Sequence, residues 1–288
     1  MKVARDPGEL DARSRAVALG TFDGVHRGHR RVLDAAVAAG QTPTAVTFDP
    51  HPRIALGYDV ELLTPLERRL ELLGEAGIDE ALVVDFDLEV AQLGPEEFVE
   101  RMLVPIGTDV VVAGANFRFG RGRSGDLELL RRLGLDVRAV PLVEGVSSTR
   151  IRDLLRAGEV ERAALLLGRP AEVEGTVVAG DARGGTLGFP TANLRPEPGL
   201  LVPGHGIYAG AADRHRAAIS IGTNPHYDGG ERRIEAFLID FDGNLYGREL
   251  RLQLWERLRD ELAFESEGEL VAQIGRDVAA TRRARPPV

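Results

Sequence analysis

The most informative segment of this sequence for the fold is Gly20-Thr21-Phe22-Asp23-Gly24-Val25-His26-Arg27-Gly28-His29. It follows an apolar run at 16–19 and precedes an amphipathic run at 30–39, so it predicts the first strand-to-helix turn of an α/β sheet. A helix N-terminus presents backbone N–H groups and the positive end of the helix dipole to a ligand. The two imidazoles, three residues apart, would face a phosphate bound there. The stretch therefore predicts phosphate chemistry.

The pattern around this stretch continues over the first 170 residues, where short apolar runs alternate with runs of helical periodicity. The predicted strands are 16–19, 44–48, 81–86, 109–113 and 135–140. The predicted helices are 30–39, 66–75, 95–103 and 127–132. Strands and helices that alternate at this spacing predict an α/β fold with a doubly wound parallel sheet. Ligands of such sheets bind at the carboxyl ends of the strands, which is where the opening stretch lies.

A second domain is predicted after Gly168-Arg169-Pro170, which ends two short helical runs at 149–156 and 160–167. Beyond this point strands and turns with frequent Gly and Pro predict a small β-barrel, followed by one C-terminal helix at 267–282. The predicted barrel strands are 171–178, 206–212, 216–221, 234–239 and 250–254. We therefore expect two domains, residues 1–170 and 171–288.

The composition limits the classes of function. A net charge of −9 over 288 residues argues against nucleic acid as the main partner. No apolar run approaches the ~20 residues that span a bilayer, and the N-terminus lacks a secretory apolar segment, so no membrane contact and a cytoplasmic location are expected. The absence of cysteine excludes disulfides, thiolate metal sites and a cysteine nucleophile. The oligomeric state stays open.

The histidine pair has two further interpretations, a metal site and a purely structural pair. The acidic and histidine side chains that could converge on a metal ion are Asp23, His26, His29, Asp49 and His51. Gly24 and Gly28 allow close approach of the backbone, which suits a phosphate better than a metal cage. We therefore favour the phosphate, with the two alternatives left open.

The segment Gly120–Gly125 matches the G-x-G-x-x-G pattern of dinucleotide-binding loops. That pattern normally follows the first strand of its domain directly. Here residues 114–119 separate it from the preceding strand, and it belongs to the fourth βα unit. We interpret it as an arginine-bearing loop.

The densest motif of the second domain is Gly180–Leu194, which contains Gly188, Thr191 and Asn193. Its glycines indicate a tight loop, and a hydroxyl and an amide carbonyl beside such a loop suit a Mg²⁺–phosphate group. It is not a Walker A loop, because no Gly-Lys-Ser/Thr is present. Glu235 lies in an otherwise apolar strand, where a carboxylate is either paired or points outward.

An ordered set of segments resembles the bacterial bifunctional riboflavin kinase/FAD synthetase family over nearly the whole chain. The opening stretch resembles the H-x-G-H signature of nucleotidylyltransferases, and Ser147-Ser148-Thr149-Arg150-Ile151-Arg152 resembles its S-S-T-x-I-R partner. The run Gly188–Asn193 resembles the G-x-P-T-A-N signature of riboflavin kinases. Further segments that match are 47–52, 114–120, 220–225, 234–241 and 245–247.

For the first domain, the resemblance implies adenylyl transfer, in which the phosphate of FMN attacks the α-phosphorus of ATP and pyrophosphate leaves. An ionised phosphate needs no general base, so the site has only to align its substrates and neutralise charge. His26 and His29 would donate hydrogen bonds to the triphosphate, and Arg152 would hold its β- and γ-phosphates. The other implied phosphate or nucleotide contacts are Gly20, Phe22, Asp23, Gly28, Asn116, Ser148 and Thr149. Helix capping by the serine and threonine, and an ordinary turn role for the asparagine, stay open.

For the second domain, the resemblance implies phosphorylation of riboflavin by ATP. Thr191 and Asn193 would bind MgATP beside Gly188, and Glu235 would be the base that removes the proton of the 5′-hydroxyl. The implied cofactor is Mg²⁺, with ATP as co-substrate and riboflavin, FMN and FAD as substrates and products. His226 and Asn244 depart from the family pattern.

Three other functions are less well supported. One is an enzyme with only one active half, and another is a flavin-binding regulatory protein without turnover. The third is an adenylyltransferase for a different phosphate ester.

Overall fold

The computed structural model describes residues 1–180, 188–223 and 232–288, and these form two compact units, Met1–Ser148 and Thr149–Val288. The division falls earlier than the boundary expected at residue 170. The reason is that helices α7 (Ser148–Arg156) and α8 (Val160–Leu167) pack with the second unit: Leu155 O accepts a hydrogen bond from Gly204 N (2.8 Å). In the described ranges every helix is too short or too polar to span a lipid bilayer.

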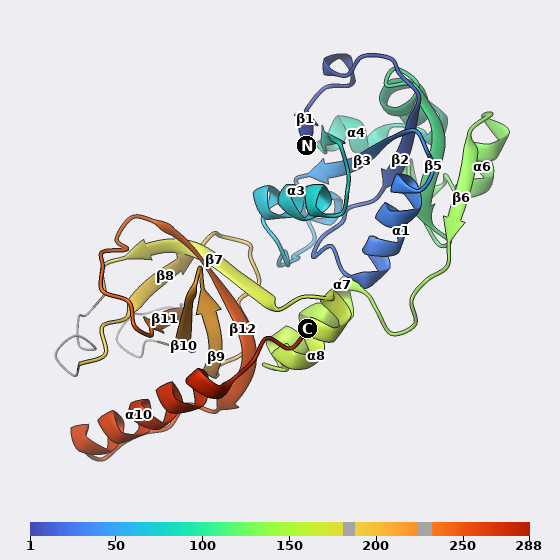
Figure 1. Cartoon of the computed structure of the whole chain (residues 1–288). Coiled ribbons are helices and arrows are strands. Elements are labelled where there is room, and N and C mark those ends of the chain that lie inside the picture. Colours follow the sequence, from blue (N-terminus) through green and yellow to red (C-terminus); the bar gives the residue numbers. More distant parts are fainter. Residues whose placement is uncertain (181–187, 224–231) are drawn as a thin grey trace. The chain divides into compact units, whose positions relative to one another are not determined.

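The first unit is built on a six-stranded, wholly parallel sheet of order β1-β4-β3-β2-β5-β6 (Figure 1). Its strands are β1 Lys2–Ala4, β2 Arg15–Leu19, β3 Thr42–Asp49, β4 Glu80–Asp85, β5 Thr108–Gly114 and β6 Asp136–Val140. Its helices are α1 Arg27–Val37, α2 Pro52–Ala55, α3 Leu66–Glu75, α4 Leu88–Gln92, α5 Pro95–Phe98 and α6 Leu127–Arg132. Short 3₁₀ turns lie at Pro7–Glu9 and Arg121–Arg123, and a π-helical segment, Val99–Leu103, continues α5. The predicted doubly wound sheet is confirmed.

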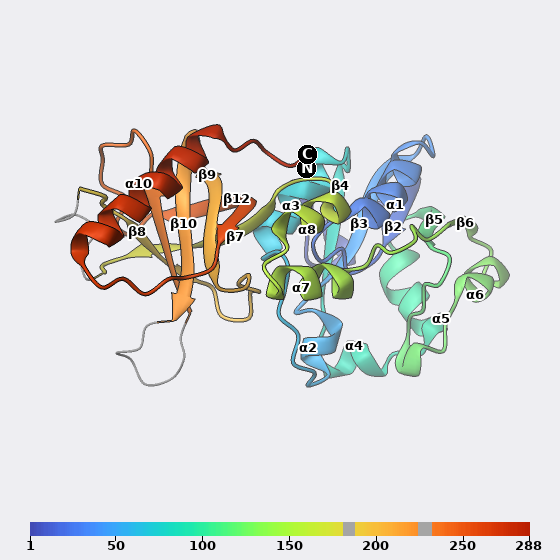
Figure 2. The same cartoon turned by 90° about the horizontal axis from the view of Figure 1, so that it is seen from below.

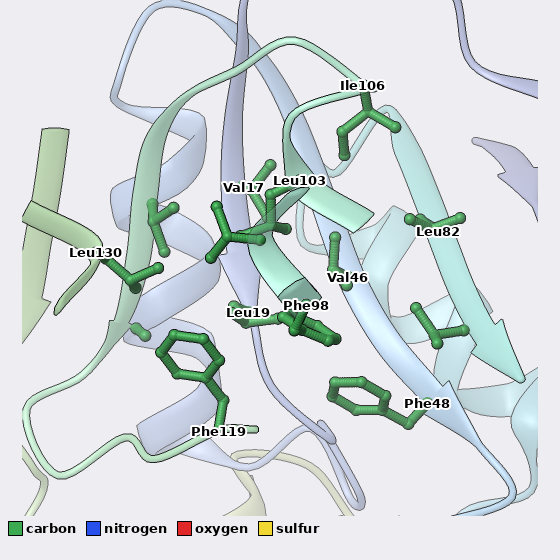
Figure 3. Packing of buried hydrophobic residues seen from close by; sticks show 14 of the residues in the cluster. Val17, Leu19, Val46, Phe48, Leu82, Phe98, Leu103, Ile106, Phe119 and Leu130 are labelled. Carbon is green, nitrogen blue, oxygen red and sulfur yellow. The ribbon is translucent and has the colours of Figure 1, made fainter. Parts of the chain in front are cut away.

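Both faces of this sheet are covered, as the side chains of β2 show. Val17 and Leu19 belong to one apolar cluster, and the alternate residues Ala16 and Ala18 belong to another. Figure 3 shows the first cluster, in which rings such as Phe98 pack beside the aliphatic side chains of the central strands. The chain runs outward from β2 through β3 to β4 and then returns to β5 on the other side of β2. The carboxyl ends of β2 and β5 therefore form the topological switch point, where such sheets bind ligands.

A buried ion pair lies near the amino ends of these strands. The fully buried Arg15 of β2 donates from Nε to Glu80 of β4 (2.7 Å). Its Nη1 donates to the carbonyls of Asp11 (2.6 Å) and Ile106. Each of these contacts joins Arg15 to a different segment, so the guanidinium ties one end of the sheet together.

The second unit contains a closed antiparallel barrel of order β10-β11-β8-β7-β12-β9. Its strands are β7 Ala171–Val178, β8 Ala192–Pro196, β9 Gly206–Ala212, β10 His215–Thr223, β11 Arg232–Leu238 and β12 Glu249–Arg259. The C-terminal helix α10 (Glu267–Arg283) packs along the outside of β9 and β10 (Figure 2). The predicted barrel with a C-terminal helix is confirmed, with β8 as a strand that the sequence pattern did not predict.

Candidate functional site

The loop between β2 and α1 has an unusual backbone. Phe22 (φ 52°), Gly24 (φ 81°) and Val25 (φ 36°) all adopt positive φ, although two of them carry side chains. Such strain persists only where surrounding structure holds it, and it is common at ligand sites. Asp23 supplies part of that support, because its buried carboxylate accepts hydrogen bonds from Leu63 N (2.9 Å) and Thr64 N (3.3 Å). The observed contacts of Asp23 anchor the loop, and the phosphate contact predicted for this residue stays a prediction.

His26 and His29 lie together on the first turn of α1. Their rings stack at a centroid distance of 3.6 Å, and Phe22 contacts His29 edge-on. His26 is the N-cap, and its Nδ1 accepts a hydrogen bond from His29 N (3.2 Å). Because Nδ1 is the acceptor, the proton of the neutral His26 ring lies on Nε2. The polar hydrogen of a neutral His26 ring is therefore on the side away from His29 N.

Gly28 explains why the two rings can stack. A Cβ at this position would lie 3.1 Å from Cε1 of His26 and 3.2 Å from its Nδ1. Gly20 has a similar part, because a Cβ there would lie 3.1 Å from the ring of Phe22. Both glycines make room for aromatic rings of the loop, which is a structural reason for their positions.

His29 is held in its neutral form. Burial, followed by the neighbouring His26 ring and the Arg69 guanidinium, lowers the pKa of His29 well below its ordinary value. Its buried Nδ1 has no hydrogen-bond partner among the described residues. A neutral imidazole beside a helix N-terminus can donate a hydrogen bond to a phosphate without adding a full charge.

Arg69, on α3, is a site residue that sequence reasoning missed. It is almost completely buried and donates from Nη1 to the carbonyls of Thr21 (3.0 Å) and Phe48 (2.9 Å). It thereby joins the loop after β2 to the end of β3. Burial lowers the pKa of Arg69, and the nearby charges of Asp23 and Asp49 oppose that shift. The doublet Arg68-Arg69 in a predicted amphipathic helix carried no signal that both side chains would be buried.

The other predicted residues of this site fall into two groups. Ser148 donates from Oγ to Asp23 O (3.0 Å), and Asn116 is exposed in the turn that follows β5, so both lie at the switch-point end of the sheet. Thr149 and Arg152 lie on α7 in the second unit. Their part in the phosphate site stays a prediction.

Two other features bear on the alternative interpretations of the sequence. Among the described residues, no three His, Cys, Asp or Glu side chains are grouped so that they could hold a metal ion. The G-x-G-x-x-G match forms a 3₁₀ turn in which a Cβ at Gly120 would lie 2.8 Å from Pro95. That glycine is needed for packing against α5, in agreement with the interpretation of this segment as an ordinary loop.

The second unit has a cavity of about 330 Å³ between the outside of the barrel and α10. Thr191, Asn193 and Glu235 all line it. Glu235 of β11 is paired in register with Asn193 of β8, which brings two of the predicted kinase residues side by side. Gly188, at φ 84°, lies nearby in the sequence, before β8.

Glu235 points outward from the barrel, but into this cavity. Ile234, Ala236 and Leu238 are buried, whereas the alternate residues, among them Glu235 and Phe237, line the cavity wall. Phe237 also contacts Phe189 edge-on, with ring centroids 5.3 Å apart. An outward position on a strand is therefore compatible with a functional carboxylate here.

Arg233, two residues before Glu235, is the second residue that the sequence analysis missed. Its Nε donates to Asn193 Oδ1 (3.1 Å), and it forms an ion pair with the carboxylate of Glu235. Gly180 makes room for the same amide, because a Cβ there would lie 2.2 Å from Asn193 Nδ2. The contact between Arg233 and Asn193 joins β11 to β8, so spacing along the sequence could not reveal it.

Asn244 and His226 are the two departures from the family pattern. Asn244 accepts a hydrogen bond from Tyr246 N (2.9 Å) through its side-chain carbonyl, a role that an aspartate carboxylate could also fill. His226 lies outside the described residues, as do 181–187 of the glycine-rich motif.

Comparison with known proteins agrees with both halves of this description. The family model for FAD synthetase matches residues 9–152, and that for riboflavin kinase matches 167–285. A bifunctional riboflavin kinase/FMN adenylyltransferase from Listeria monocytogenes is 38% identical, with 93% of this chain and 92% of that protein covered. One from Escherichia coli is 36% identical, with 92% and 91% covered.

A solved structure is similar over both units. The protein described as a macrolide-efflux protein from Streptococcus pneumoniae superposes with a TM-score of 0.89, at 31% identity, over 98% of each chain. The two family models follow each other in the order predicted from the motifs, and the relatives match over almost their full length. The chain therefore belongs to the family of bifunctional riboflavin kinase/FMN adenylyltransferases, which make FMN and FAD.

Proposed function

We propose that the two activities use separate sites, with the adenylyltransferase in residues 1–170 and the kinase in 171–288. The observation that carries this proposal is that each unit has its own set of polar groups suited to a phosphate. One set lies at the switch point of the parallel sheet, beside the two stacked histidines. The other lies in the cavity beside the barrel, where Glu235 faces Asn193.

In the first unit, ATP would bind with its phosphates at the N-terminus of α1. The helix dipole and the Nε2–H of His26 favour the negative charge there, and neutral His29 adds a second donor. The attacking phosphate of FMN is already ionised, so neither histidine has to act as a base. The resemblance also assigns Arg152 to the charge that develops on the leaving pyrophosphate, and this residue lies on α7, outside the first unit.

In the second unit, Glu235 would take the proton of the riboflavin 5′-hydroxyl as that oxygen attacks the γ-phosphate of ATP. The hydroxyl of Thr191 and Oδ1 of Asn193 are hard oxygen donors, which suit a Mg²⁺ ion carried by the nucleotide. When bound, Mg²⁺ supplies charge neutralisation of the phosphates.

The proposal is tested by incubating the protein with riboflavin and MgATP and separating the flavins by chromatography. We expect FMN first and then FAD. His29→Ala should let FMN accumulate, and Glu235→Ala should block FMN formation yet still convert added FMN to FAD. If Glu235→Ala also abolished FAD formation in a folded protein, the assignment of separate sites would be wrong. If no flavin product formed at all, a flavin-binding protein without turnover would be favoured.

A further inference from the structure

Arg233 occupies the two groups on which the kinase chemistry would depend. Its Nε–H lies on Asn193 Oδ1 at 3.1 Å, and the same guanidinium is paired with the Glu235 carboxylate. Arg233 and Glu235 are each only about one-third exposed, at 30% and 29% of the side chain, so water screens the pair incompletely. In this state one guanidinium contacts both the amide oxygen and the carboxylate.

A divalent cation on Asn193 Oδ1 would meet that guanidinium at close range. Even at the dielectric constant of water, the repulsion between a unit charge and a divalent ion about 4 Å apart corresponds to a change in binding constant of about tenfold or more. Arg233 therefore has to leave Asn193 before a cation can be coordinated there.

Among the described residues, three other charged side chains line the cavity: Arg259, Asp277 and Glu261. Arg259 and Asp277 neutralise each other through a contact of 2.7 Å. Glu261 lies 4.0 Å from His205 Nδ1. Over the described ranges, no three His, Cys, Asp or Glu side chains are grouped around a point that could hold a metal ion. A bare cation at Asn193 would thus have few protein ligands, and phosphate oxygens would have to complete its coordination shell.

We propose that the Arg233 guanidinium occupies the position of a divalent metal ion in the kinase site. The site would then bind such a metal only as a metal–nucleotide complex. A bare metal ion would compete with the guanidinium for Asn193 and would bring no anion of its own. A nucleotide brings phosphate oxygens, which pair well with a guanidinium released from Glu235. Arg233 thereby also holds Glu235 and Asn193 in place until the nucleotide arrives. This inference rests on the proposed roles of Asn193 and Glu235.

The test is titration of the full-length protein with Mn²⁺, with the unbound ion measured by electron paramagnetic resonance, in the absence and presence of ADP. Arg233→Met should bind bare Mn²⁺ at least about tenfold more tightly than the wild type, because one positive charge is lost. Its affinity for Mn²⁺–ADP should change less, so the preference for the complex falls. Arg233→Lys should keep most of the preference. Arg214→Met, which removes an exposed arginine from the turn between β9 and β10, should behave as the wild type.

The proposal is overturned if Arg233→Met binds bare Mn²⁺ no more tightly than the wild type, or if Arg214→Met shows the same gain. A purely structural arginine would give the first result, because damage to the cavity does not tighten metal binding. Where Arg233→Met does not fold, Arg233→Gln replaces it, with Trp255 fluorescence as the folding check. Failure of the proposed function is separate: it would appear as riboflavin phosphorylation that survives in Glu235→Gln, whatever the Mn²⁺ result.

Discussion

His29 should make the first unit sensitive to mild acid. Its pKa is lowered well below 6.5 in the folded protein, chiefly by burial, and returns to that ordinary value when the chain unfolds. A base with a lowered pKa contributes stability that is complete above pH 6.5 and is lost as the pH falls below it. Between pH 7.5 and 5.5, the free energy of unfolding therefore falls by at most about 1.4 kcal/mol, from RT ln(1 + 10^(6.5−5.5)). The retained solvent access of His29 makes this an upper figure.

The variant that tests this is His29→Gln, which cannot take up a proton in this range. Hydrogen exchange of the β2 amides reports opening of the first unit, and fluorescence of Trp255, the single tryptophan, reports unfolding of the barrel. We expect the wild type to lose up to about 1.4 kcal/mol more than His29→Gln in the first unit, and the two proteins to agree in the barrel. The reasoning is refuted if both proteins lose equal stability in β2, because His29 would then titrate alike in folded and unfolded chains.

Three further substitutions probe other contacts. Arg15→Met should destabilise the first unit by about 3–5 kcal/mol in urea unfolding, because it leaves Glu80 buried without its cation. Combining it with Glu80→Met should recover part of that loss. Additive losses in the double variant would contradict this expectation. Gly28→Ala would place a Cβ 3.1 Å from the neighbouring imidazole and should slow conversion of FMN to FAD by about tenfold to a hundredfold, with riboflavin phosphorylation unchanged as the control. Gly180→Ala would place a Cβ 2.2 Å from the side-chain amide of Asn193 and should slow riboflavin phosphorylation while leaving conversion of FMN to FAD unchanged. The same chromatographic assay measures both reactions. An equal loss of both activities would indicate general unfolding.

Elements with strong periodicity were predictable from the sequence, and those fixed by partners were not. The long strands and helices of the sheet follow from runs such as Thr42–Asp49, whose centre is buried on both faces. β8 has no clean alternation of buried and exposed residues, and pairing with β7 and β11 defines it as a strand. β1, α2 and α4 span only three to five residues, too few to show a period.

The same distinction applies to the sites. The histidine pair could be predicted because both members lie on one helical turn, within a single motif. Arg69 and Arg233 could not, because their contacts join segments that are far apart in the sequence. For Asp23, the motif predicted a ligand contact, which stays a prediction, and the structure adds that Leu63 N and Thr64 N donate to its carboxylate. The unit boundary at Ser148 likewise depends on packing of α7 and α8 that no local pattern encodes.

We propose that one chain transfers the γ-phosphoryl group and the adenylyl group of ATP at two independent sites. Riboflavin can be supplied with ATP labelled at either the α- or the γ-phosphorus, and the label followed into FMN and FAD. We expect γ-label in both flavins and α-label in FAD alone. With Glu235→Gln and added unlabelled FMN, we expect α-label in FAD and no γ-label in any flavin. Transfer of α-label into FMN, or loss of α-label from FAD in the folded variant, would contradict the proposal.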